Sequence, residues 1–169
     1  MALPKVLRYF NVFGDGESFL GEVEEVALPK LSIKTEGYRG GPMLGEVDQD
    51  MGLEKLEMES TFGGPMRSVL QQFGVTTHDG AMLRYVGSYK SEDSQSVDAY
   101  EVVTRGRHTE MDFGSQKAGD KSPFKVKTSC SYYKLSINGV TEIEIDMVGM
   151  VFIVGGVDRL AEHRLALGI

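Results

Sequence analysis

Residues 131–146 of the chain are SYYKLSINGVTEIEID, and they carry the strongest structural signal in the sequence. On both sides of Asn138-Gly139, apolar and polar residues alternate with the period of two that a half-buried β-strand requires. Asn and Gly both tolerate a positive φ, so this dipeptide between two alternating runs predicts a tight turn. The stretch therefore predicts a β-hairpin, with one strand over 124–137 and the next over 140–146.

Two registers are possible for this hairpin. A two-residue loop would place Leu135 opposite Glu142, which sets a carboxylate against an apolar side chain. A three-residue loop pairs Tyr133 with Ile143 and Lys134 with Glu142, which keeps apolar side chains together. Because a slip by one residue moves every side chain to the other face of the sheet, we expect the three-residue loop and the Lys134–Glu142 cross-strand pair.

Further strands are predicted wherever alternation or a short apolar run lies between glycine-rich or polar segments. They cover 9–13, 18–23, 28–37, 55–62, 81–90, 97–107 and 148–154. Two short helices are expected, one beginning near Pro65 and ending at Gly74 and the other over 157–167. Strands outnumber helices, so the predicted fold class is mainly β: a β-sandwich or barrel-like fold with two short α-helices.

Length and composition favour one soluble domain over residues 1–169. Cys130 is the only cysteine, which excludes an intrachain disulfide and suits a reducing compartment. The sequence shows neither the apolar run of a signal peptide at its start nor a membrane-spanning stretch, so we expect synthesis in the cytoplasm. The formal net charge is −7 with no basic stripe, which argues against tight nucleic-acid binding.

The segment 38–52, YRGGPMLGEVDQDMG, shows no helical period and is rich in glycine. A connection of this length inside one domain is usually a functional loop or a disordered one. Its apolar members favour a partner-binding surface over simple disorder.

A search for catalytic chemistry finds no supporting pattern. His78, His108 and His163 lie far apart and lack the ligand spacing of a zinc site. Cys130, between two serines of a predicted strand, is interpreted as a packed core thiol. We therefore predict no catalytic, cofactor or metal site, and a protein that is not an enzyme.

Several short motifs, in order along nearly the whole chain, resemble the FII family of major tail tube proteins from contractile-tailed bacteriophages. The tube proteins of R-type bacteriocins look similar. The motifs are 20–31 (LGEVEEVALPKL), 38–41 (YRGG), 51–54 (MGLE), 117–120 (KAGD), 131–135 (SYYKL), 156–158 (GVD) and 165–168 (LALG).

The resemblance implies a structural protein whose copies form hexameric rings, stacked into the hollow inner tube of a contractile tail. It implies that DNA passes through the lumen, without tight binding, during ejection through the host envelope. The implied partners are further copies of the chain, the tail sheath protein, a baseplate or initiator complex and the tape measure protein. The implied location is the virion tail, after synthesis in the host cytoplasm as a late protein.

Two sets of residues are candidates for assembly roles. The ring-stacking candidates are Tyr38, Arg39, Met43, Leu44, Val47 and Met51, with the N-terminal segment 2–8 as a second choice. The lumen-facing candidates are Lys34, Glu36, Lys55, Glu57 and Glu59, from the polar faces of the strands flanking the long loop. The opposite faces of those strands (Leu31, Ile33, Leu56 and Met58) are expected to pack in the core.

Two alternatives remain at the level of the sequence. One is a tube protein of a headless contractile injection system, either an R-type bacteriocin or a type VI-like tube. The other is an unrelated small β-domain, acting as a binding module or as an enzyme with a dispersed site, which would remain monomeric.

Overall fold

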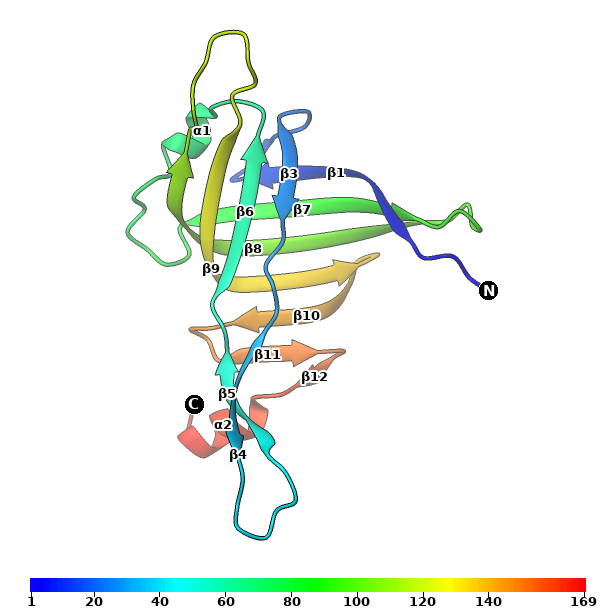
Figure 1. The fold of residues 1–169 in the computed structure, drawn as a ribbon, viewed down its shortest axis with the longest axis vertical. Coiled ribbons are helices and arrows are strands. Elements are labelled where there is room, and N and C mark those ends of the chain that lie inside the picture. Colours follow the sequence, from blue (N-terminus) through cyan, green and yellow to red (C-terminus); the bar gives the residue numbers. More distant parts are fainter.

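The computed structural model describes all residues, 1–169, and is built almost entirely from β-strands (Figure 1). The strands are β1 (Val6–Gly14), β2 (Glu17–Ser18), β3 (Val23–Ala27), β4 (Ile33–Tyr38), β5 (Val47–Leu53), β6 (Leu56–Phe62), β7 (Ala81–Lys90), β8 (Val97–Asp112), β9 (Phe124–Ile137), β10 (Val140–Asp146), β11 (Val151–Val154) and β12 (Val157–Asp158). Two short helices are α1 (Arg67–Leu70) and α2 (Ala161–Leu167). The mainly β fold class with two helices is thus confirmed.

One ten-stranded sheet contains every strand except β4 and β5, and it folds over on itself through the long strand β9. Residues Phe124–Cys130 of β9 pair with β6, whereas Tyr132–Ile137 pair with β10. As a result β3, β6 and the first half of β9 cross in front of β1 and β7 at a steep angle (Figure 1). Two layers made in this way enclose a core between their inner faces.

The corner between the layers depends on Gly106 in β8. The β8–β9 register shifts between Arg105 and Gly106, so β8 bends where β9 changes its partner. A Cβ atom at Gly106 would lie 2.0 Å from the carbonyl oxygen of Ser129. Only glycine allows this approach of two backbones.

The core follows the alternation of the strands. Leu56, Met58 and Phe62 of β6 are fully buried, as the sequence predicts for 55–62. They meet Phe124 and further apolar side chains from the crossing strands, namely Val12, Phe19, Leu83, Tyr85, Val102, Val126, Tyr133 and Ile145. The predicted core thiol, Cys130, is also buried here, and burial raises its pKa to about 11.

The predicted register of the β9–β10 hairpin is wrong. Val140 pairs with Ile137, so the loop has two residues, and Asn138 and Gly139 have φ of 50° and 82°. A bulge at Glu142 then shifts the ladder, so that Lys134 faces Glu144 and not Glu142. The bulge brings Ile143 opposite Leu135, so the sheet keeps apolar residues together through an extra residue in β10 instead of a longer loop.

The expected strand 28–37 and the expected loop 38–52 need correction together. The strand begins only at Ile33 and runs to Tyr38, and residues 47–52 of the expected loop belong to strand β5, which pairs with β4 in a separate two-stranded sheet. The side chains of Leu31 and Ile33 are 39% and 48% exposed, so they do not pack in the core. The reason is that this hairpin leaves the main sheet and projects beyond it (Figure 1).

The C-terminal third differs from prediction in its details. The expected helix 157–167 begins only at Ala161, because Val157–Asp158 add a short strand to β11. The expected buried strand 148–154 is shortened to β11 and is only half-buried. Helix α1 is one turn, shorter than expected, although Gly74 adopts the predicted left-handed conformation.

Candidate assembly surfaces

The β4–β5 hairpin is the most prominent projection of the molecule (Figure 1). Its strands pair from Ile33–Leu53 at the base to Tyr38–Val47 near the tip, and Glu54 N–H donates to the Ser32 carbonyl at the base (2.8 Å). Because no other strand pairs with it, the hairpin is an arm attached through its base.

The tip of the arm, residues 39–46, is held by its own short contacts. Met43 N–H donates to the Gly40 carbonyl (3.0 Å), and Gly40 N–H lies 3.0 Å from the Met43 sulfur. The Arg39 guanidinium donates to the Met43 carbonyl (3.3 Å). Met43 therefore organises the tip, and Leu44 next to it is left fully exposed.

All six ring-stacking candidates lie on this one arm. Met43 is half-buried, and the other five are exposed to solvent (Tyr38, Arg39, Leu44, Val47 and Met51). Exposed apolar side chains gathered on one projecting element are typical of a surface that binds a partner.

The lumen candidates fall on two elements. Lys34 and Glu36 lie on the arm, whereas Lys55, Glu57 and Glu59 lie on or just before β6. Lys55 and Glu57 form an exposed ion pair (2.8 Å), and the hydrogen bond from Lys55 lowers the pKa of the Glu57 carboxyl. None of the five is buried, so all can face a solvent-filled space.

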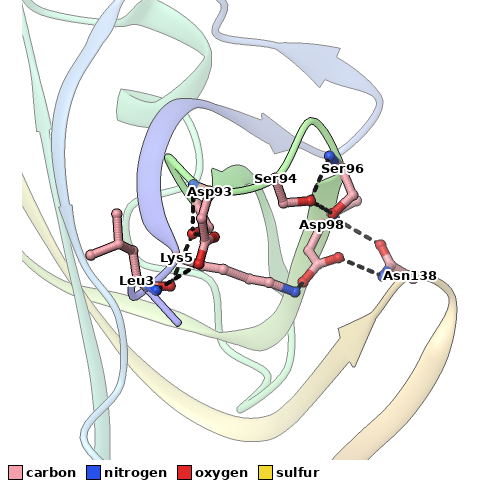
Figure 2. Close-up of polar contacts among 9 residues, drawn as sticks. Leu3, Lys5, Asp93, Ser94, Ser96, Asp98 and Asn138 are labelled. Atoms are coloured by element: carbon pink, nitrogen blue, oxygen red, sulfur yellow. Dashed lines mark hydrogen bonds and ion pairs between the residues drawn. The ribbon is translucent and has the colours of Figure 1, made fainter. Parts of the chain in front are cut away.

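Sequence reasoning missed a polar network that ties the N-terminal segment to two turns of the same subunit (Figure 2). Leu3 N–H donates to Asp93 (2.8 Å), and the Ser91 hydroxyl donates to the Leu3 carbonyl (2.9 Å). Lys5 contacts Asp98, whose other carboxylate oxygen accepts from Asn138 (3.1 Å). The sequence contained one signal for this network: the turn 91–98 is acidic, whereas the N-terminal segment carries the basic residues Lys5 and Arg8.

These contacts perturb the charged groups in the network. The hydrogen bond with Asp98 raises the pKa of Lys5, and the same contact lowers the pKa of Asp98. The Ser91 hydroxyl and the Leu3 N–H lower the pKa of Asp93. The N-terminal segment, the second-choice stacking candidate, is thus held against its own subunit.

Helix α2 is attached mainly by polar contacts. Arg164 pairs with Asp158 and donates to the Met150 carbonyl (2.7 Å), and Gly168 ends the helix with a φ of 75°. No α2 residue is buried, and its end exposes Leu165, Leu167 and Ile169. A seven-residue helix with so little burial depends on its anchors.

Little in the structure resembles a chemical site. No three His, Cys, Asp or Glu side chains are placed to hold a metal ion. Of the three histidines, only His108 is buried, and it contacts Thr128 (2.8 Å) and Gln72 (3.0 Å). Burial lowers the pKa of His108, while the charge of Asp15 opposes that shift. Neither helix is long and apolar enough to cross a membrane.

Comparison with known proteins gives a consistent picture along the sequence. The family model described as phage tail tube protein FII matches residues 4–168. The chain is 40% identical to the tail tube protein of Escherichia phage P2, with both proteins covered over their whole length. It is 37% identical to the major tail tube protein of Serratia phage KSP20, over 90% of this chain and 88% of that protein.

The fold is also similar to chains in solved structures of contractile injection systems. One is from the sheath/tube terminator of the PVC extracellular contractile injection system, with a TM-score of 0.59, 11% identity, and coverage of 79% of this chain and 96% of that chain. Another is from the sheath–tube complex of the same system, with a TM-score of 0.57, 12% identity, and coverage of 79% and 91%. These two likenesses concern the fold.

Proposed function

Because the chain belongs to the phage tail tube protein FII family, we propose that it forms hexameric rings that stack into the hollow inner tube of a contractile tail. The observation that carries this proposal is the 40% identity with a phage tail tube protein over the full length of both chains. The tube would be the conduit for DNA ejection through the host envelope.

Ring formation is supported by two unpaired sheet edges. Residues 6–11 of β1 pair only with β7. At the other end of the sheet the free edge of β11 is short: Val151 pairs only with β10, because the Phe152 carbonyl accepts from the Arg159 N–H (2.8 Å). Exposed edges are templates for pairing with another chain. All five steps from β1 to β11 are antiparallel, so the two edges run in opposite directions and fit an antiparallel junction between neighbours.

Such a junction joins two different surfaces of the same chain. A heterologous contact of this kind closes into a ring when the rotation between neighbours completes a circle. Closure would pair the β1 and β11 edges, which removes both from uncontrolled association. The outer edge of β3, which pairs only with β6, stays free.

Stacking of rings is assigned to the β4–β5 arm. The arm projects past the sheet (Figure 1), and its tip presents Leu44 to solvent. We assign the lumen to the polar residues Lys34, Glu36, Lys55, Glu57 and Glu59. A channel without a basic stripe would let DNA slide, because few phosphate contacts are available to hold it.

The proposed partners are further copies of the chain, the tail sheath protein, a baseplate or initiator and the tape measure protein. The proposed location is the virion tail, with synthesis as a late protein in the host cytoplasm. The alternative is the tube of a headless contractile injection system, and the fold similarity to the PVC chains favours keeping it. The presence or absence of capsid genes beside the coding sequence separates the two.

The test is negative-stain electron microscopy of the purified protein over a range of concentrations. We expect hollow rings or tubes of uniform width, formed with or without purified baseplate initiator. Leu44→Asp should leave the fold unchanged but prevent stacking, whereas Leu44→Met, which keeps an apolar side chain, should still form tubes. Met43 is less suitable because it holds the tip together.

Two outcomes would contradict the proposal. Particles that stay monomeric even with initiator would contradict the tube itself. Normal tubes from Leu44→Asp would contradict the stacking role of the arm while leaving the tube intact.

A further inference from the structure

An apolar pocket of about 390 Å³ opens at the end of the molecule that carries the arm and α2 (Figure 1). Its walls come from the base of the arm (Ile33, Leu53), the β10–β11 turn (Met147, Met150) and the start of α2 (Leu160). A cavity of about 150 Å³ with apolar walls already accepts benzene. The pocket therefore has room for an aromatic side chain.

The pocket is preformed within one subunit. Met150 holds a φ of 52°, a left-handed conformation that side chains other than glycine rarely adopt. Its carbonyl accepts from Arg164 (2.7 Å), which also pairs with Asp158. The β10–β11 turn and α2 are thus fixed to each other, so the pocket walls need little rearrangement to receive a ligand.

The opposite end of the molecule exposes an aromatic side chain. Phe73 follows α1 and is 58% exposed, although its backbone is held by a hydrogen bond to the Leu70 carbonyl (3.2 Å). The preceding Gln72 points inward, accepting from His108 (3.0 Å) and donating to Asp15 (2.5 Å). These anchors hold the segment, so Phe73 is presented to solvent at a fixed position.

The charged side chains nearest to Phe73 along α1 and inside the pocket include groups of opposite sign. Asp50 and Asp146 line the pocket, and their carboxylates accept only backbone N–H groups, from Gly52 (2.7 Å) and Gly149 (2.9 Å) among others. Neither has an ion-pair partner. In α1, Arg67 is exposed and also lacks an ion-pair partner. An aromatic residue with a nearby Arg is a common anchor pair at protein interfaces.

We propose that Phe73 of one copy inserts into the pocket of the copy stacked on it, with Arg67 facing the pocket's carboxylates. This inference rests on the proposed stacking of rings. The occupant and the pocket lie at opposite ends of one chain, so the contact repeats without closing and builds an open filament. It adds a second contact between rings, separate from the tip of the arm.

Leu20 provides a matched control. It is 73% exposed in the turn that leads into β3, but it is smaller and not aromatic. That turn and α1 lie at the same end of the molecule (Figure 1). Substitutions at Leu20 therefore test whether any exposed apolar side chain at this end is sufficient.

The first experiment uses fluorescence. The chain contains no tryptophan, so Phe73→Trp creates a single reporter. We expect its emission maximum to shift to shorter wavelength when tubes form, while Leu20→Trp keeps a solvent-like maximum. A solvent-like maximum for Phe73→Trp in assembled tubes would overturn the proposal.

The second experiment locates the partner with a double-mutant cycle. Phe73→Ala should raise the concentration needed for tube formation by about 10- to 100-fold, the equivalent of leaving one Phe side chain unburied. Met147→Glu, at a partly exposed pocket residue, should have a similar effect. If the two residues meet, the double variant is no worse than either single variant.

If the double variant raises the concentration needed for tube formation by the product of the two single effects, the contact is overturned. Leu20→Ala combined with Met147→Glu should give such independent effects. Circular dichroism of each unassembled variant checks that the fold is intact. If wild-type protein forms no tubes under any condition, the proposed function itself fails. If tubes form but Phe73 stays in solvent, only this contact fails.

Discussion

Replacing Gly106 with alanine tests the explanation of the corner between the two layers. The new Cβ would lie 2.0 Å from the Ser129 carbonyl oxygen and 2.9 Å from the Cα of Cys130. Both neighbours are backbone atoms, so no side-chain rotation can relieve the overlap. Strand β8 would have to move away from β9 at the position where Gly106 pairs with Cys130.

The size of the effect follows from two contributions. Overpacking a tight site costs about 1–3 kcal/mol, and each disturbed ladder hydrogen bond adds about 1 kcal/mol. We expect a loss of about 2–4 kcal/mol in the free energy of unfolding. For a chain of this length, that lowers Tm by about 5–15 °C.

The assay is thermal and urea denaturation of the unassembled protein, followed by circular dichroism. Gly64→Ala is the matched control, because no atom lies within 4 Å of the position that its new Cβ would occupy and its φ is not in the left-handed region. A Tm for Gly106→Ala within about 2 °C of the control would refute the close-approach argument.

Three further predictions follow from single groups. Burial lowers the pKa of His108, so the unfolded state takes up its proton first as pH falls below about 6.5. Stability should drop between pH 7 and 5.5, and His108→Gln should reduce this pH dependence. Cys130, whose pKa burial raises to about 11, should resist thiol reagents in the folded protein and react at the global unfolding rate; fast labelling would contradict its core position. Arg164→Ala should increase amide hydrogen exchange in α2 without increasing that of β9, because α2 has no buried residue to hold it.

The sequence predicts well those elements whose signals are local. The bounds of β7, β9 and β10 match their expected ranges, because each alternates regularly and ends at a turn residue. The amphipathic strand β6 buries the residues expected of it, including Leu56 and Met58. The mainly β class and the turn at Asn138-Gly139 follow from the same kind of signal.

The errors arise where a distant segment completes the hydrogen bonding. The bulge at Glu142 is an example: its carbonyl accepts from Gly155, in the turn after β11. Alternation in 131–146 cannot reveal that neighbour, so it predicts the right apolar pairing with the wrong loop length. Likewise Leu31 and Ile33 alternate as a core strand does, yet they lie where the chain leaves the main sheet.

For the candidate surfaces, too, the sequence predicts the residues and the tertiary structure supplies their arrangement. Tyr38, Leu44 and the other apolar residues of 38–52 predict a partner surface from the sequence alone, because apolar residues are unusual in a glycine-rich connection. The arm that carries them became visible only when β4 and β5 paired.

Local patterning and family motifs were therefore sufficient for the fold class, the main strands and membership of the tail tube family. Three features could be recognised only in the tertiary structure: the arm, the contacts that hold the N-terminal segment, and the pocket at the opposite end from Phe73. Each of these joins residues far apart in sequence, as Lys5 and Asp98 show, and such contacts leave no periodic signal. They exist because burial of the crossing strands fixes where the connecting turns meet.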